Sequence, residues 1–215
     1  MINDIKHIFN KGVNKSPIFL DDSDKKRFLE SLYKLNNKGR ALRDRSKDMF
    51  QNPPGQKKIV EVLKWTLMPN YFHLLLLEKE TGGITEFIKR LTNSYTKYFN
   101  IKYKRSGYLF QNKTQTLLIE RKEQFLYIPS YIDLSSLSLS YPSWKENGVK
   151  NADRAMEWLT DYEWSSFYDY QDVMQRKYNC LINQAEFYKN FSTNKNKYKT
   201  DLLKLIKEPL NKLDR

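Results

Sequence analysis

The chain has little of what builds disulfides, metal clusters or membrane spans. Cys180 is the single cysteine among 215 residues, which excludes an intrachain disulfide framework and a cysteine-based zinc site. This count favours a reducing compartment. No apolar run approaches the ~20 residues that a membrane-spanning helix needs, and the first residues lack the apolar core of a signal peptide. We therefore expect a cytoplasmic protein without a membrane partner.

Acidic residues are scarce relative to basic ones. Lysine and arginine total 38 against 25 aspartates and glutamates, which gives a formal net charge of +13. This balance favours a polyanion as partner, nucleic acid first and an anionic membrane surface second, although a merely soluble basic protein is an alternative. With 40% hydrophobic residues the chain can bury one good core. We expect a main domain at 1–140 and a helical C-terminal extension at 141–215 packed on it.

The most apolar run of the chain follows a turn signal. Met68-Pro69-Asn70 predicts a tight turn, and residues 71–77 are too apolar and too short for a surface helix, so they predict a buried strand. Side chains alternate between the faces of a strand, so Tyr71 and His73 should point the same way. Residues 59–66 predict the partner strand of this hairpin.

Other segments supply the remaining elements. Residues 5–20 predict a first strand and a loop, and an acidic cap at 21–24 begins a helix. Apolar residues recur at helical spacing from 84 to 98 and again from 120 to 132, with a strand predicted at 114–119 between them. Residues 38–58 are polar and predict a connecting loop. The order strand-helix-strand-strand-helix-strand-helix predicts an α+β domain with an antiparallel sheet.

A long window from Phe87 to Ile119 contains no acidic residue. Basic residues are interleaved there with aromatic ones, as in proteins that neutralise phosphates and stack unpaired bases. The window predicts DNA contacts by Lys89, Arg90, Lys97, Lys102, Lys104, Arg105 and Lys113. A solvated helix face is the alternative for these cations, and we expect Phe87, Tyr95 and Phe99 to be core residues because they share the apolar helical spacing.

Three separate motifs occur in order along the chain. Residues 68–77 read Met-Pro-Asn-Tyr-Phe-His followed by four leucines, residues 108–113 read Tyr-Leu-Phe-Gln-Asn-Lys, and residues 162–168 read Tyr-Glu-Trp-Ser-Ser-Phe-Tyr. Together they resemble the HUH single-tyrosine transposases, especially the REP-associated branch. The resemblance covers roughly residues 4–170. It implies a ferredoxin-like antiparallel sheet with helices on one face, which is the HUH endonuclease arrangement.

The resemblance also implies a reaction and its residues. Family members are metal-dependent tyrosine transposases, DNA endonucleases that bind single-stranded or hairpin DNA and cleave and rejoin it through a 5′-phosphotyrosine intermediate. The family's tyrosine motif matches residues 131–136, so Tyr131 is the expected nucleophile, with Tyr127 as second choice. The expected ion is Mg²⁺ or Mn²⁺. His73 is an expected ligand, Tyr71 stands where the family has its first histidine, and Ser135 would be a weak third contact.

These replacements leave alternatives open. A neutral phenol at Tyr71 is a poor ligand, and Asp133 lies about 200° round the helix from Tyr131 and should face away. His7 on the first strand is a candidate substitute ligand, although a lone histidine is more often structural. A decayed or domesticated transposase that binds DNA without cleaving it is one alternative function, and an RNA-binding module is another. Members of the family act as monomers or homodimers, and the sequence favours neither.

Overall fold

The computed structural model describes residues 2–39, 50, 57–171 and 176–208. Most of the connecting loop predicted at 38–58 lies outside these residues. Within them, no helix is both long and apolar enough to cross a membrane.

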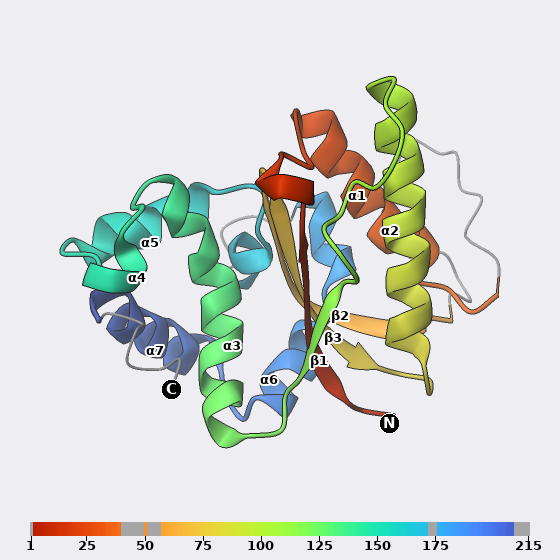
Figure 1. Ribbon diagram of the computed structural model, residues 1–215. Helices are drawn as coiled ribbons and strands as arrows, with labels where there is room; N and C mark the ends of the chain where they lie inside the picture. Colours follow the sequence, from red (N-terminus) through yellow and green to blue (C-terminus); the bar gives the residue numbers. More distant parts are fainter. Residues whose placement is uncertain (1, 40–49, 51–56, 172–175, 209–215) are drawn as a thin grey trace.

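Four strands form one antiparallel sheet with the order β2-β3-β1-β4 (Figure 1). The strands are β1 (Ile5–Lys11), β2 (Val60–Met68), β3 (Tyr71–Glu78) and β4 (Gln115–Leu118). The predicted hairpin joins β2 to β3 across Pro69 and Asn70. Helix α1 (Asp22–Leu35) connects β1 to β2, and α2 (Gly83–Lys102) connects β3 to β4. The α+β class, the order of the elements and the ferredoxin-like sheet are confirmed.

Helices α1 and α2 pack side by side on one face of the sheet (Figure 1). Asp21 accepts a hydrogen bond from the backbone N–H of Asp24 and begins α1, as the acidic cap predicted. The ring of Phe28 on α1 lies 5.0 Å from that of Phe72 on β3 and 5.2 Å from that of Tyr95 on α2. All three rings are buried, so this face holds the main aromatic core.

The opposite face of the sheet is covered by α3 (Lys122–Leu134) (Figure 1). The alternation of side chains in β2 and β3 places Thr66 and His73 on this face. The hydroxyl of Thr66 donates to the carbonyl of Ile132 at 2.9 Å and fixes the end of α3 over the hairpin. The expected layer of helices on one face is formed by α1 and α2, whereas α3 adds a layer on the opposite face, which the expectation did not include. The second layer forms because the side chains of β2 and β3 on this face are also apolar, or are hydrogen-bonded inside the fold.

The chain after α3 closes the outer edge of β2. It contains α4 (Trp144–Asn147), α5 (Ala152–Asp161), α6 (Gln184–Asn190) and α7 (Lys195–Lys207), together with short 3-10 segments at Ser135–Leu139, Ser166–Tyr170 and Lys177–Leu181. The N–H of Leu67 donates to the carbonyl of Trp164 at 2.8 Å, and the N–H of Asn183 donates to the carbonyl of Val62 at 2.9 Å. These bonds satisfy backbone groups that an open edge strand would expose. Trp164 is buried, as predicted.

Candidate active site

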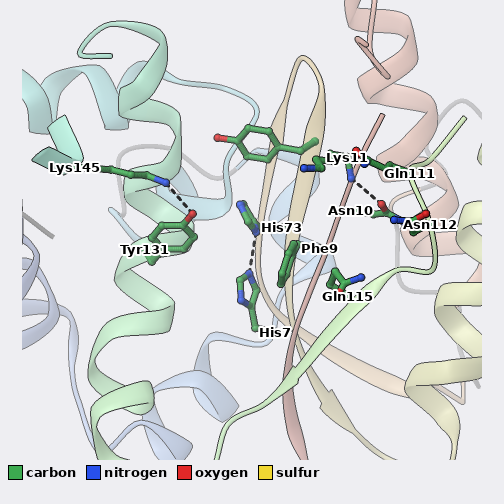
Figure 2. Close-up of a pocket in the computed structure, with 11 residues that line it drawn as sticks. His7, Phe9, Asn10, Lys11, His73, Gln111, Asn112, Gln115, Tyr131 and Lys145 are labelled. Atoms are coloured by element: carbon green, nitrogen blue, oxygen red, sulfur yellow. Dashed lines mark hydrogen bonds between the residues drawn. The ribbon is translucent and has the colours of Figure 1, made fainter. Parts of the chain in front are cut away.

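A pocket of about 450 Å³ opens between the sheet and α3 (Figure 2). Its lining residues come from β1, β3, α3, α4 and the segment around β4, and they are His7, Phe9, Asn10, Lys11, Tyr71, His73, Gln111, Asn112, Gln115, Tyr131 and Lys145. None of these described residues is acidic, whereas two are lysines. The pocket therefore suits an anion that can accept hydrogen bonds.

Tyr131 and His73 meet in this pocket although they lie 58 positions apart in the sequence. Tyr131 projects from the last turn of α3, and His73 projects from the central strand β3 toward it (Figure 2). Their ring centroids are 5.6 Å apart in an edge-to-face arrangement. The structure thus brings together the two side chains that the sequence paired as nucleophile and ligand. Their chemical roles stay a prediction.

His7 supplies the second imidazole of the pocket. Its Nε2 lies 2.9 Å from His73 Nδ1. Strand β1 pairs with β3 so that Phe9 is opposite His73, which places His7 diagonally across from His73 on the same face. Burial lowers the pKa of His7 to about 4, and burial, with the charges of His7 and Lys145, holds the pKa of His73 well below its usual value. Both rings are therefore neutral near pH 7, and one of the two facing nitrogens carries the shared hydrogen.

The two replaced ligand positions differ in their surroundings. Tyr71 lines the pocket with its ring 5.1 Å from that of His73, and burial raises the pKa of its phenol. Ser135 is buried outside the pocket lining, and its hydroxyl donates to the carbonyl of Ile132 at 2.8 Å. The weak metal contact expected of Ser135 is therefore not supported, because the turn that ends α3 uses its hydroxyl.

The donor set of the pocket does not fit Mg²⁺ or Mn²⁺. These ions prefer oxygen ligands, carboxylates above all. The pocket offers two imidazoles that face each other, two phenols, four side-chain amides and no carboxylate, while Lys11 and Lys145 add positive charge. Across the described residues, no group of three or more His, Cys, Asp or Glu side chains could hold a metal. Asp133 faces away, as expected, and its Oδ2 accepts a hydrogen bond from Lys64 at 2.7 Å.

Lys145 is a site residue that the sequence did not indicate. Its ammonium donates a hydrogen bond to Tyr131 Oη at 2.9 Å and lies 4.6 Å from the centroid of that ring (Figure 2). It sits on α4, and the neighbouring Trp144 is buried in a core formed with Leu134 and other residues of the C-terminal segment. No motif surrounds Lys145, so only the docking of α4 reveals its position.

A second pocket, of about 500 Å³, adjoins the first on the side of α2. Asn10 and Asn112 line both pockets. Lys97 and Lys113, two of the predicted DNA contacts, line the second one together with Tyr108, whose side chain is 88% exposed. An exposed aromatic ring beside two cations matches the pattern expected for single-stranded nucleic acid.

The other predicted DNA contacts are divided. Lys102 was predicted to contact phosphate, but its ammonium lies 2.8 Å from Asp21 and 2.7 Å from Asp24, because the end of α2 meets the acidic cap of α1. That charge is neutralised within the fold. Arg90 pairs with Glu86 at 2.6 Å, and Arg105 donates to the carbonyl of Tyr108 at 3.0 Å. Lys89 and Lys104 are exposed.

Part of the chain matches a known protein family. Residues 32–133 match the family described as "Transposase IS200 like". No curated protein sequence matches the chain. One similar solved structure is that of a REP-associated tyrosine transposase bound to a REP hairpin, with 12% sequence identity and a TM-score of 0.45 over 80% of this chain and 82% of that chain. The matched segment includes His73 and extends two residues beyond Tyr131.

Proposed function

We propose that the chain binds single-stranded or hairpin DNA and breaks and rejoins it through Tyr131, as a transposase. One observation carries the proposal. The Tyr131 side chain lies beside His73 in a pocket whose described lining is free of acidic residues. A phosphodiester carries one negative charge and accepts hydrogen bonds, so it fits such a pocket.

The cleavage step exchanges one phosphate ester bond for another. Tyr131 Oη forms a bond to phosphorus while the bond from phosphorus to the 3′ oxygen breaks. The phenol gives up its proton to solvent, and the departing 3′ oxygen takes one up. The product has the 5′ phosphate on Tyr131 and a free 3′ hydroxyl, and attack by another 3′ hydroxyl reverses the step. The covalent intermediate conserves the phosphodiester energy, so rejoining needs no external energy source.

The imidazole pair orients the phosphate in this proposal. We assign His7 Nε2–H as the donor to His73 Nδ1 across the 2.9 Å contact, an assignment that leaves the hydrogen of His73 on Nε2. That N–H then donates to a non-bridging phosphate oxygen, and Lys11 adds positive charge at the rim of the pocket.

The flanking nucleotides extend toward the second pocket. Asn10 and Asn112 connect the two pockets, so a strand that leaves the phosphate at Tyr131 reaches Lys97 and Lys113. These cations contact backbone phosphates, and Tyr108 stacks on an unpaired base.

Incubation with a labelled DNA hairpin that has a single-stranded flank tests the proposal. The wild-type protein should form an adduct that survives denaturation, and Tyr131→Phe should abolish it. Tyr127→Phe is the matched control, because Tyr127 lies one turn earlier on α3 and does not line the pocket. Tight DNA binding without an adduct would instead support a binding protein that has lost cleavage. A preference for RNA over DNA of equal sequence would contradict the proposal.

A further inference from the structure

We infer that Lys145 is a catalytic residue. Its ammonium supplies positive charge at Tyr131 Oη, a role that the family resemblance gives to a divalent metal. Strand transfer by this protein therefore needs no metal. This inference rests on the proposed function of Tyr131. It goes beyond that function because it names the source of charge stabilisation.

When the phenol oxygen attacks phosphorus, negative charge is shared between that oxygen and the phosphate. A metal ion would stabilise this charge by electrostatic attraction. Lys145 Nζ lies 2.9 Å from the attacking atom itself, which is the distance of a charge-assisted hydrogen bond. The same ammonium stabilises Tyr131 Oη as the leaving group during rejoining.

Among the described residues, Lys145 forms no ion pair with a carboxylate, in contrast to Lys102, which contacts two aspartates. Its charge is thus available to the substrate. Burial of Trp144, at 1% exposure, holds the adjacent backbone of α4 in place. Lys145 is therefore positioned by the core and differs from a solvated surface lysine.

A divalent cation in this pocket would approach Lys11 and Lys145 without a carboxylate to offset their repulsion. It would also have to displace the hydrogen that the facing imidazole nitrogens of His7 and His73 share at a distance of 2.9 Å. The chemistry of the lining therefore favours resident ammonium groups over a bound ion.

The test measures the rate of adduct formation at saturating DNA, with EDTA and with Mg²⁺ or Mn²⁺. We expect wild-type rates to agree within about twofold in all conditions. Lys145→Met keeps much of the side-chain length and removes the charge, so the rate should fall by about 100-fold or more while the Kd for DNA changes by less than about threefold. Lys145→Arg should recover part of the rate. Lys150→Met, an exposed lysine in the same segment, is the matched control.

The outcomes separate this inference from the proposed function. Absence of any Tyr131-dependent adduct would overturn the proposed function itself. An adduct that requires Mg²⁺ or Mn²⁺ would overturn the inference and leave Tyr131 as nucleophile, and so would an adduct whose rate Lys145→Met leaves unchanged. A further measurement does not depend on activity. When the protein is titrated with Mn²⁺ and the free ion is monitored by electron paramagnetic resonance, no stoichiometric site should appear. A Mn²⁺ site that His73→Gln removes would refute the inference. Near-ultraviolet circular dichroism of Lys145→Met and Lys145→Arg checks that both variants fold.

Discussion

Replacing Asp133 with leucine should destabilise the fold strongly, because it leaves the ammonium of Lys64 alone in the interior. Lys64 Nζ lies 2.7 Å from Asp133 Oδ2, and both side chains are fully buried. Tyr198 donates its hydroxyl to the same oxygen at 2.6 Å, and the ring of Tyr170 lies 3.9 Å from the ammonium. This cluster joins β2, α3 and α7 two residues beyond Tyr131, so it also holds the proposed nucleophile in place.

The size of the effect follows from what Lys64 can do without its partner. Breaking a buried pair by removing one member costs about 3–5 kcal/mol. The lysine can also escape by losing its proton, which at pH 7 costs about 1.36 kcal/mol for each of the ~3.4 units below its ordinary pKa, or ~4.6 kcal/mol. That value is a ceiling, and the aromatic rings around the ammonium lower the cost of keeping the charge. We expect a loss of about 3–5 kcal/mol in the free energy of unfolding.

The loss should depend on pH with a definite sign. Burial lowers the pKa of Lys64 in the folded chain, and in Asp133→Leu no carboxylate opposes that shift. The unfolded state of the variant then binds more protons than the folded state, so its stability rises with pH between the folded and the unfolded pKa of the lysine. The deficit relative to wild type should shrink by up to about 1.4 kcal/mol per pH unit as the pH rises toward ~10.

Urea denaturation at pH 7 and pH 9 measures both effects. The double variant Lys64→Met/Asp133→Leu is the control, because it removes both charges and should recover most of the stability without the added pH dependence. The reasoning would be refuted if Asp133→Leu cost less than about 1 kcal/mol, or if its deficit grew between pH 7 and pH 9.

Three further predictions test other parts of the structure. Lys113→Ala should weaken DNA binding and reduce the salt slope of log Kd by about one, measured by fluorescence anisotropy, whereas Lys102→Met should leave the slope unchanged because aspartates already neutralise its charge; equal slopes would contradict the assignment. Tyr71→His places a third imidazole beside His73, so Co²⁺ should acquire visible absorbance with this variant, and a silent spectrum would argue against the pocket geometry. Asn36→Ala removes bonds to three backbone groups at the start of β2 and should cost about 1–3 kcal/mol in thermal unfolding; a neutral result would show that these groups find other partners.

The fold was accessible from the sequence wherever its signals are local. The Pro69-Asn70 turn and the apolar run after it specify a hairpin, and the alternation of a strand then fixes the face that His73 occupies. Helical spacing identified the buried side of α2, and Phe87, Tyr95 and Phe99 are in the core as expected. Each of these inferences depends on residues within a few positions of one another.

The site was less accessible because its particular groups depend on long-range pairing. A shift of one residue between β1 and β3 would turn His7 to the other face, and no local signal sets that register. The prediction for Lys102 was wrong for the same reason, because its partners are distant in the sequence. A window without acidic residues predicted a free cation, yet the aspartates that neutralise it lie about 80 positions earlier in the chain.

Residues inside and outside the family match contribute differently to the site. The segment that matches the transposase family, 32–133, contains His73 and Tyr131. The groups that give this pocket its own chemistry lie outside that segment, His7 on the N-terminal side and Lys145 on the C-terminal side. The pairing of β1 and the docking of α4 deliver these groups to the atoms that the family segment provides. In the proposed reaction, phosphate orientation and charge stabilisation therefore depend on flanking elements, whereas the nucleophile lies in the matched segment.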